Sequence, residues 1–308
     1  MATTVESAPV QAGSPRPAVH VTELLLLCMA LIWGINFSVV KYGTEVVSPL
    51  AFNAMRVGLA AVFLGLLAVP RTDRPSRRDI VMLVLLGVLG NGAYQMLFIE
   101  GVARTRAGDA ALVIAATPAF VALIGRVRGT ERVTPRGALG IALSMLGIGL
   151  VVFGNAAARA GESSILGNSL VLAAAFCWSF YTVLSRPYTA RVDGIQLSAY
   201  TMVGGAVPLL LIGLPAMMAT PWREVSGAAW AAVLYSGLGS MVVAYLIWYR
   251  GVRVLGPTRT AMFGNLQPLF ALVVAWLALG EALTLWQGVG AASIMSGLLL
   301  TRSGAQSL

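Results

Sequence analysis

Apolar residues gather in long runs along this chain, and each run lasts about as long as a helix that crosses a membrane. A bilayer-spanning helix needs roughly 20 apolar residues. Helices are the natural spanning element, because lipid offers the backbone no hydrogen-bond partner. A transmembrane β-barrel would instead show segments of roughly ten residues with alternating polarity. We therefore predict an all-α polytopic membrane protein with ten transmembrane helices, at residues 23–43, 49–69, 79–101, 108–127, 135–154, 167–186, 194–217, 227–249, 258–279 and 284–301.

Composition agrees with this pattern. Of the 308 residues, 58% are hydrophobic and 11% are charged, and the mean hydropathy is +0.83. A soluble domain carries about 25% charged residues. We expect residues 1–22 to form a disordered cytoplasmic tail, 155–166 a linker and 303–308 a second tail. The first span should remain as an anchor, because no cleavable signal peptide precedes it.

The basic residues are divided unevenly between the segments that join the spans. With a cytoplasmic N-terminus, 15 of the 21 Lys and Arg residues fall in cytoplasmic segments. A bias of this kind over short loops predicts the orientation of a membrane protein. We therefore predict that both termini are cytoplasmic and that the protein is a multi-pass protein of the bacterial cytoplasmic (inner) membrane. The net charge of +9 is then a sign of topology, and we expect no nucleic-acid partner. Outside the cytoplasmic segments lie Arg56, within a span, and Lys41, Arg104, Arg106, Arg159 and Arg223.

The chain repeats itself after 150 residues. Matched Pro, Phe, Glu and Thr residues in one register rarely arise by chance, so we infer a duplication, with one five-helix repeat at 23–154 and a second at 167–302. Nearer the start of the repeats the offset is 145, where Trp33 matches Trp178. The matches at 150 are Gly87 with Gly237, Gly101 with Gly251, Pro118 with Pro268, Phe120 with Phe270, Glu131 with Glu281, Thr134 with Thr284, and Gly147 with Gly297.

An odd number of spans in each repeat inverts the second copy. After five spans the chain lies on the side opposite to where it began, so the second repeat enters the membrane from the opposite face. Glu131 and Glu281 precede the fifth span of their repeats, and we expect each to cap the helix N-terminus there, where an acid is favoured. Inverted repeats are common in secondary transporters, which hold their substrate near the midplane between the repeats.

Several stretches carry a resemblance to a known family. They are "LIWGINFSVVK", "PLAFNAMRVGLAAV" and "ATPAFVAL" in the first repeat, and "AFCWSFYTVLSR" and "NLQPLFALVVAWLALGEALTLW" in the second. Over about residues 23–302 the chain resembles the EamA-like branch of the drug/metabolite transporter superfamily. The resemblance implies a ten-helix secondary transporter with a central cavity lined by spans 1, 3, 4, 6, 8 and 9. Bacterial exporters of aromatic and other amino acids are nearest in kind.

Polar side chains inside the spans indicate where a substrate binds. Such groups are costly in lipid and usually face the protein interior or a water-filled cavity. Amides donate to a carboxylate and accept from an ammonium, and aromatic faces suit apolar groups and cations. This chemistry fits a zwitterion or a small neutral metabolite, although amides also hold helices together. The predicted substrate-binding residues are Trp33, Asn36, Asn91, Tyr94, Gln95, Trp178, Tyr181, Tyr245, Asn265 and Gln267.

Two prolines and three charged residues have other predicted roles. A proline inside a helix removes an N–H group and clashes with the carbonyl four residues back, so Pro118 and Pro268 predict matching hinges in spans 4 and 9. We expect Arg56 to serve as a structural or gating group that snorkels outward or pairs with an acid or a carbonyl. Glu100 and Arg104 are spaced for an i, i+4 ion pair, with an outer gate as the alternative.

The pattern as a whole predicts a secondary transporter that exports amino acids or related small metabolites by alternating access around a midplane cavity. The alternatives are a drug or quaternary-amine exporter, a sugar-phosphate or nucleotide-sugar antiporter, and a channel. A phosphorylated sugar would need several basic residues at the midplane, and the chain places none there except Arg56. The central spans carry no acid, so we expect uniport or exchange in place of proton coupling.

An enzyme is not expected from this sequence. Its only histidine, His20, lies in the predicted tail, and the chain has no phosphate-binding Gly-Lys-Ser/Thr loop. We expect no metal and no cofactor. Small residues at packing spacing in the fifth and tenth spans favour close helix contact, so we expect a monomer, with a homodimer through these two helices as the alternative. They are Gly140, Ser144, Ser293 and Gly297.

Overall fold

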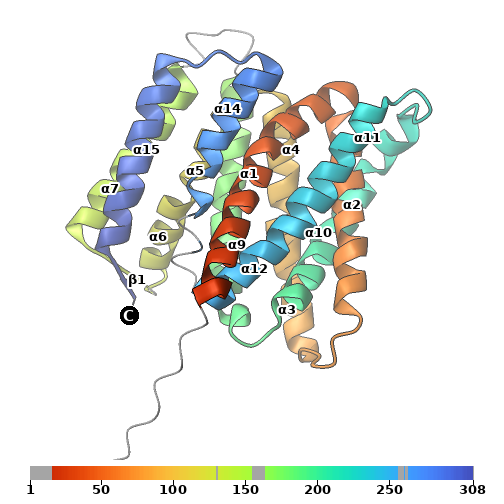
Figure 1. Cartoon of the computed structure of the whole chain (residues 1–308), viewed down its shortest axis with the longest axis horizontal. Coiled ribbons are helices and arrows are strands. Elements are labelled where there is room, and N and C mark those ends of the chain that lie inside the picture. The colour runs from red at the N-terminus through yellow and green to blue at the C-terminus, as the bar shows by residue number, and fades with distance from the viewer. Residues whose placement is uncertain (1–15, 130, 155–163, 256–259, 261–262, 308) are drawn as a thin grey trace, which may run out of the picture.

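The computed structural model describes residues 16–129, 131–154, 164–255, 260 and 263–307, and over these residues the chain is helical apart from one short strand pair (Figure 1). Three π-helical segments, η1 to η3, directly follow α-helices with no residue between. The elements are α1 (Arg16–Val46), α2 (Pro49–Ala68), α3 (Arg77–Gly87), η1 (Val88–Ala93), α4 (Tyr94–Ala103), α5 (Ala107–Ala115), α6 (Thr117–Val127), β1 (Glu131–Val133), α7 (Pro135–Gly149), η2 (Leu150–Gly154), α9 (Ile165–Thr189), α10 (Gly194–Ala219), α11 (Gly227–Leu234), η3 (Tyr235–Val243), α12 (Ala244–Leu255), α14 (Gln267–Leu279), α15 (Leu285–Gly304) and β2 (Ala305–Ser307).

Eight helical stretches within the described residues are long and apolar enough to cross a membrane. Two shorter apolar helices, Gln267–Leu279 and Leu285–Leu300, occupy the ninth and tenth predicted spans. The helical, membrane-spanning character is thus confirmed, and ten crossings remain a prediction. The eight are Val19–Val46, Pro49–Ala68, Arg77–Ala103, Ala107–Val127, Pro135–Gly154, Ile165–Thr189, Gly194–Ala219 and Gly227–Leu255.

The predicted tails differ from the structure at both ends of the chain. Residues 1–15 of the predicted N-terminal tail and 155–163 of the predicted linker lie outside the described residues. Helix α1, however, begins at Arg16, several residues before the predicted first span, because a proline is well placed in the first turn of a helix. The predicted C-terminal tail forms the end of α15 and then β2, which pairs antiparallel with β1.

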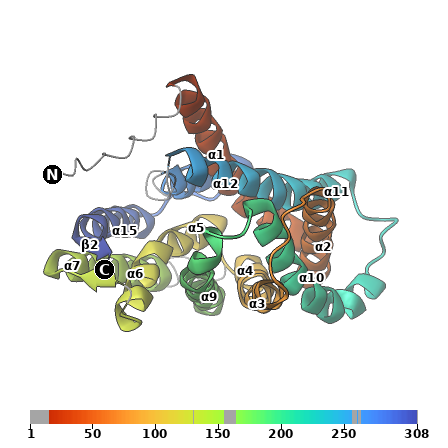
Figure 2. The same ribbon diagram turned by 90° about the horizontal axis from the view of Figure 1, so that it is seen from below.

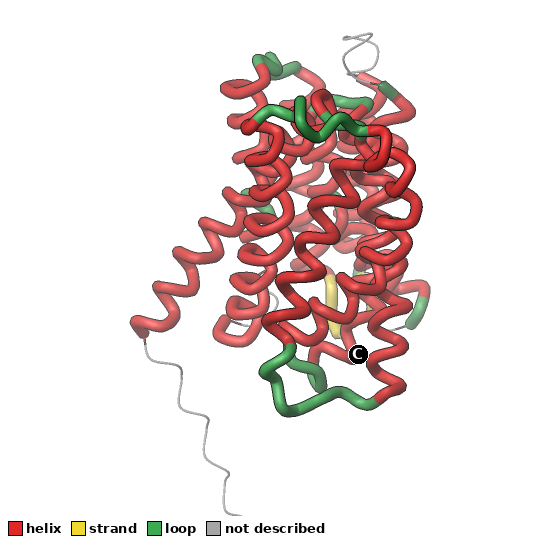
Figure 3. Tube along the Cα trace, turned by 90° about the vertical axis from the view of Figure 1, so that its right-hand side faces the viewer, coloured by secondary structure: helices red, strands yellow, loops and turns green. Residues whose placement is uncertain are grey.

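The connections between helices lie in two sets, one at each end of the bundle (Figure 3). At the lower end of Figure 1, Asp193 before α10 faces Arg71 after α2 at 4.0 Å and Arg253 near the end of α12 at 3.7 Å. At the upper end, the Thr105 hydroxyl between α4 and α5 donates to Asn168 near the start of α9 at 2.7 Å. Helix α1 therefore ascends in Figure 1 and α9 descends, as an inverted repeat requires.

Helix packing follows the repeat that the sequence contains. Helix α1 packs against α14, η3 and α12, and its counterpart α9 packs against α5, α6, η1 and α4. Helix α2 packs against α10 and η3, while α10 packs against α2, α3 and η1, and α7 packs against α15. Each of these interfaces thus has a partner made by the other repeat.

Glycines allow the closest of these approaches at matching places. A Cβ atom on Gly87 would lie 2.0 Å from the carbonyl oxygen of Thr201, and one on Gly237 would lie 2.9 Å from that of Arg56. Gly87 and Gly237 match at an offset of 150, and Arg56 and Thr201 match at 145. The backbones of α3 and α10, and of η3 and α2, therefore touch in the same way in both halves.

Small residues in α7 and α15 have the same role. A Cβ on Gly297 would lie 2.5 Å from the carbonyl oxygen of Gly140 and 2.4 Å from the Ser144 hydroxyl. These residues bring two helices of one chain together, which is the close contact expected from the sequence. A homodimer through the same helices remains a prediction.

Candidate substrate-binding cavity

A cavity of about 210 Å³ lies between the two repeats. Its wall comes from α1, α4, α5, α6, α9, η3, α12, the start of α14 and the turn before it, and from α2 through Arg56. Cavities for drug-sized ligands measure roughly 300–1,000 Å³, so this one suits a smaller molecule. A larger hollow of about 610 Å³ on α7 and α15 is shallow and lined by small and aliphatic residues such as Leu143 and Val289, which makes it a weaker candidate.

Aromatic side chains from both repeats form much of the cavity wall. The Trp33 indole N–H donates to the Ser240 carbonyl oxygen at 3.0 Å, which fixes the ring, and its centroid lies 6.2 Å from that of Tyr245. Trp178, the counterpart of Trp33 in the second repeat, lies 5.0 Å from Tyr94 and 6.5 Å from Tyr245. Aromatic faces of this kind accept apolar groups and cations.

Arg56 joins three helices at the cavity wall. Its side chain is 1% exposed, and Nε donates to the Asn53 side-chain oxygen at 3.0 Å. Nη1 donates to the Ser236 hydroxyl at 2.9 Å, and Nη2 donates to the Gln95 side-chain oxygen at 2.6 Å. All three acceptors are neutral, and no acidic side chain contacts Arg56 within the described residues. The predicted snorkelling and pairing with an acid are therefore wrong for Arg56, whereas the predicted pairing with a carbonyl is confirmed by the side-chain carbonyl oxygens of Asn53 and Gln95.

The two prolines lie at the cavity wall where helices break. Helix α5 ends at Ala115 and α6 begins at Thr117, while α14 begins at Gln267, so each break directly precedes a proline. The Thr117 hydroxyl donates to the Ile114 carbonyl oxygen at 2.6 Å, which satisfies a carbonyl near the interruption. The breaks thus lie at the predicted points, and a hinge motion there remains a prediction.

The π-helical segments end at matching positions beside the cavity. Segment η1 ends at Ala93 and η3 at Val243, which are equivalent under the offset of 150. A π-helical turn holds an extra residue and is found frequently at functional sites. Here the turns precede Tyr94 and Gln95 in one repeat and Tyr245 in the other, all at the cavity wall.

Eight of the ten residues predicted to bind substrate line the cavity; Asn91 and Tyr181 do not. Asn91 packs against Gly205 of α10, and Tyr181 lies behind Trp178, with its hydroxyl 3.4 Å from that of Thr201. The sequence reading missed Phe37, Phe98 and Trp248, which also line the cavity. Their spacing of three or four residues from Trp33, Tyr94 and Tyr245 was the available signal, because it places them on the same helix faces.

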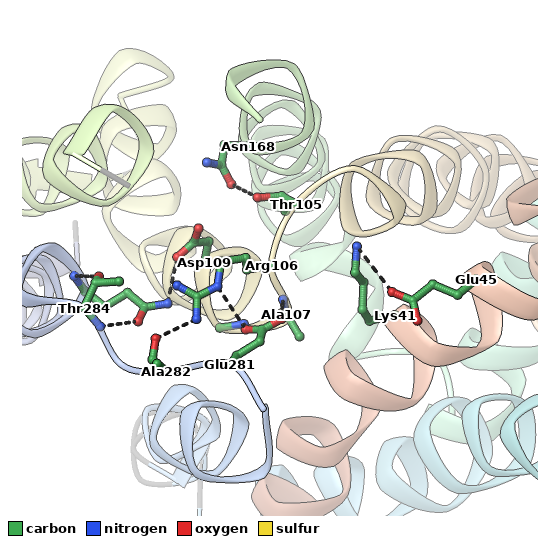
Figure 4. Close-up of polar contacts among 12 residues, drawn as sticks. Lys41, Glu45, Thr105, Arg106, Ala107, Asp109, Asn168, Glu281, Ala282 and Thr284 are labelled. Carbon is green, nitrogen blue, oxygen red and sulfur yellow. Dashed lines mark hydrogen bonds and ion pairs between the residues drawn. The ribbon is translucent and has the colours of Figure 1, made fainter. Parts of the chain in front are cut away.

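At the upper end, Glu281 joins the α14–α15 connection to α5 (Figure 4). Its carboxylate accepts from the backbone N–H groups of Ala107 at 2.7 Å and Gly108 at 3.1 Å, and Arg106 lies 3.8 Å away. Glu281 therefore caps α5, and the prediction that it caps the helix that follows it is wrong. Thr284 caps α15 instead, since its hydroxyl accepts from the Gln287 backbone. The side chain of Glu131 lies outside the described residues.

Glu100 and Arg104 form the predicted i, i+4 ion pair at the same end. Arg104 also donates to the Glu100 carbonyl oxygen at 2.7 Å. Both side chains are partly exposed, at 20% and 43%, so the pair lies beside the bundle end and not in the cavity wall. A gating role for it remains a prediction.

The cavity is closed at the upper end by α1 and α4. The Phe37 and Phe98 rings are both buried and meet edge to face at 5.6 Å. The Lys41 ammonium donates to the Ala103 carbonyl oxygen at 3.2 Å.

The lower end lacks the matching closure. In the second repeat, Thr182 stands at the position of Phe37 and is exposed. Helices α9 and α12 form no comparable interface in the described part of the chain, and Figure 2 shows them apart at this end. Within the described residues, the lower end therefore lacks the ring pair that closes the upper end.

Comparison with known proteins identifies the class. The profile of the EamA-like transporter family matches residues 20–153 and again 165–303. The uncharacterized transporter YyaM of Bacillus subtilis is 28% identical over 91% of this chain and 93% of its own. A probable terminal-alkyne amino-acid exporter of Streptantibioticus cattleyicolor is 31% identical over 89% of this chain and 91% of its own. A solved crystal structure with 21% identity covers 94% of this chain and 99% of its own, with a TM-score of 0.63, which shows the same fold.

The double match and the cavity between the two halves define a multi-pass membrane transporter. The chain belongs to the EamA-like transporter family, of the drug/metabolite transporter superfamily. The family resemblance read from the sequence is thereby confirmed.

Proposed function

We propose that the protein exports amino acids or related small zwitterionic metabolites across the bacterial cytoplasmic membrane by alternating access. One observation carries the proposal: the cavity is lined by both inverted repeats, and the aromatic ring pair that closes its upper end has no counterpart at the lower end in the described residues. In a fold of this symmetry, exchanging the conformations of the two repeats would close the lower end and open the upper one.

The topology behind this proposal is ten crossings with both termini in the cytoplasm. Arg71, Arg191 and Arg253 all lie at the lower end, where they form ion pairs with Asp193 or Asp79. The excess of basic residues in the connections assigned to this end favours the cytoplasmic side. The structure then corresponds to a cytoplasm-facing state, which is the state that loads an exported substrate.

The cavity chemistry favours a small zwitterion over the alternatives. The wall offers amides, hydroxyls, indoles and one guanidinium. The positive charge of Arg56 disfavours a quaternary amine, because like charges repel. A phosphorylated sugar would need more than one cationic side chain to bind its phosphate. The relative from Streptantibioticus cattleyicolor carries a name that points to an amino acid as cargo. A channel is disfavoured, because the upper end is shut by packed aromatic rings.

The mechanism we propose uses the helix breaks before Pro118 and Pro268 as hinges. Movement there would separate Phe37 from Phe98 at the upper end and bring α9 toward α12 at the lower end. In the described part of the chain no acidic side chain lines the cavity, which supports uniport or exchange over proton coupling.

Counterflow into proteoliposomes tests the proposal. Purified protein is reconstituted with an unlabelled L-amino acid inside, and uptake of the labelled compound is followed for a panel of amino acids, quaternary amines and sugar phosphates. We expect saturable uptake of at least one amino acid with a transient overshoot. Flux that rises linearly with concentration and shows no overshoot would indicate a channel, and overshoot confined to quaternary amines would replace the proposed substrate class.

A further inference from the structure

The guanidinium of Arg56 is buried at the cavity wall without an acidic partner in the described part of the chain. A buried charge is expensive unless it is paired and hydrogen-bonded. Asn53, Gln95 and Ser236 satisfy three of its N–H groups with neutral oxygens. A guanidinium carries five N–H donors in a planar fork that fits a carboxylate. Two donors and the whole positive charge of Arg56 therefore remain for another group.

Asn36, at the wall of the same cavity, has an oxygen that needs a hydrogen-bond donor. It lies on α1, is 7% exposed and contributes to the cavity wall. Its side-chain oxygen is buried and accepts no hydrogen bond. An ammonium group has three donors and no acceptor, so it is a suitable partner for this oxygen.

We infer that the cavity holds a zwitterion by both ends, with the carboxylate at Arg56 and the ammonium at the Asn36 side-chain oxygen. This inference rests on the proposed transport function and names its substrate class. The substrate's third substituent then faces the aromatic wall formed by Trp33, Tyr94 and Trp178.

The repeat limits the cavity to one carboxylate. The residue of the second repeat that matches Arg56 is Thr201, and the one that matches Asn36 is Tyr181. The Thr201 hydroxyl donates to the Leu197 carbonyl oxygen of its own helix at 2.9 Å. The second repeat therefore has no cation at this place, and a monocarboxylate fits the cavity better than a dianion.

Arg56 also acts as an interhelical support in its present contacts. It connects α2 with α4 and η3 through Gln95 and Ser236, and its guanidinium carbon lies 5.7 Å from the centre of the Phe98 ring. Phe98 closes the upper end with Phe37. A carboxylate at Arg56 would thus lie directly beside the residues that separate when the upper end opens.

Binding measured without transport tests the inference first. Trp33, Trp178 and Trp248 line the cavity, so intrinsic tryptophan fluorescence of the purified protein is titrated with a panel of L-amino acids. The amino acid with the strongest response is then compared with its carboxamide, which lacks the anion, and with its des-amino acid, which lacks the cation. We expect the carboxamide to bind about 10- to 100-fold more weakly, as for loss of a charge-assisted hydrogen bond.

Variants assign the two ends of the ligand. Arg56→Gln should weaken binding of the amino acid by the same factor and abolish its advantage over the carboxamide, and Arg56→Lys should restore part of that advantage. Asn36→Leu should remove the advantage of the amino acid over its des-amino analogue. Arg104→Gln, at an exposed arginine, should leave both preferences intact.

The outcomes separate this inference from the proposed function. If the wild type binds amino acid and carboxamide equally, or responds to no amino acid, the inference is wrong, and this result needs no variant that might fail to fold. An Arg56→Gln protein that keeps the preference also overturns it. Carboxylate-selective binding that depends on Arg56, in a protein that shows no counterflow, would uphold the site and reject the transport function.

Discussion

Replacing Phe37 by threonine should open the upper end of the cavity. Phe37 and Phe98 are 2% and 3% exposed and meet edge to face. The second repeat carries the exposed Thr182 at the same place. The change therefore gives the closed upper end the residue that the second repeat has at the lower end.

The size of the effect follows from the contact that is lost. Burying a phenylalanine side chain contributes about 1.5–3 kcal/mol, and an aromatic pair adds about 0.5–1.5 kcal/mol. If about half of this contact persists when α1 and α4 separate, the closed state loses about 1–2 kcal/mol relative to the open state. That is a ~5- to 30-fold shift of the population toward the open upper end.

Labelling of one cysteine from the upper side measures this population. Cys28 and Cys177 are first replaced by serine, and Ala111, which lines the cavity within α5, is replaced by cysteine. A membrane-impermeant maleimide is added on the upper side of reconstituted vesicles, and the labelling rate is followed. The rate should rise in proportion to the open fraction.

The matched control is Phe63→Thr. Phe63 is 42% exposed on the outer face of α2, so the same substitution there should leave the labelling rate unchanged. An unchanged rate in a Phe37→Thr protein whose melting temperature shows a folded state would refute the gating role of this ring pair. An equal rise in both variants would refute it as well.

Three further predictions concern the upper end, the packing and the energy source. Glu281→Gln should lower the free energy of unfolding by about 2–3 kcal/mol in thermal melts, because it removes the negative charge that faces Arg106 and caps α5. A change below about 0.5 kcal/mol, which is typical of a surface substitution, would contradict this. Gly87→Ala should be destabilising by about 1–3 kcal/mol or more, since its Cβ would lie 2.0 Å from a carbonyl oxygen, whereas Gly65→Ala, with nothing within 4 Å, should be neutral or stabilising. Counterflow should be the same with and without a pH gradient, because no acid lines the cavity; strong dependence on the gradient would show proton coupling.

The sequence predicted the helices and the repeat well because both leave periodic signals. Apolar runs of helical length mark the spans, and matched residues such as Pro118 and Pro268 survive in one register. The cavity wall was predicted largely from polar residues in these runs, because a polar side chain is costly in lipid and usually faces the protein interior or a cavity. Asn265 and Gln267 were found in this way and line the cavity.

Contacts between distant segments were harder to predict. Glu281 precedes α15 in the chain, and only the folded structure brings the N-terminus of α5 within its reach. Asn91 is as polar as Asn36, but a turn of π-helix places it against α10 in place of the cavity. Burial and partner identity depend on tertiary packing, which a single sequence does not reveal.

The contacts of Arg56 were predicted only in part, because the sequence shows that a charge lies within a span but not which residues surround it. An arginine within a span ordinarily snorkels or pairs with an acid. Here it is fully buried, and amide and hydroxyl oxygens from three helices hold it without cancelling its charge. These oxygens replace the hydrogen bonds that water would make to the guanidinium. They do not neutralise its charge, which therefore remains for a ligand.

Position 56 has the same backbone packing as its counterpart in the second repeat, but its charged side chain has no counterpart there. Its backbone carbonyl is approached by Gly237 as the carbonyl of Thr201 is approached by Gly87, so the two halves share the packing on which the proposed exchange of conformations would rely. Its side chain has no counterpart, since Thr201 is neutral. The proposed alternating access relies on backbone packing that is the same in both repeats. A substrate with one carboxylate, by contrast, needs only one guanidinium. Substituting Thr201 by arginine should therefore add a second buried charge without a ligand to pair with it, and we expect the symmetric chain to be less stable and no better at binding.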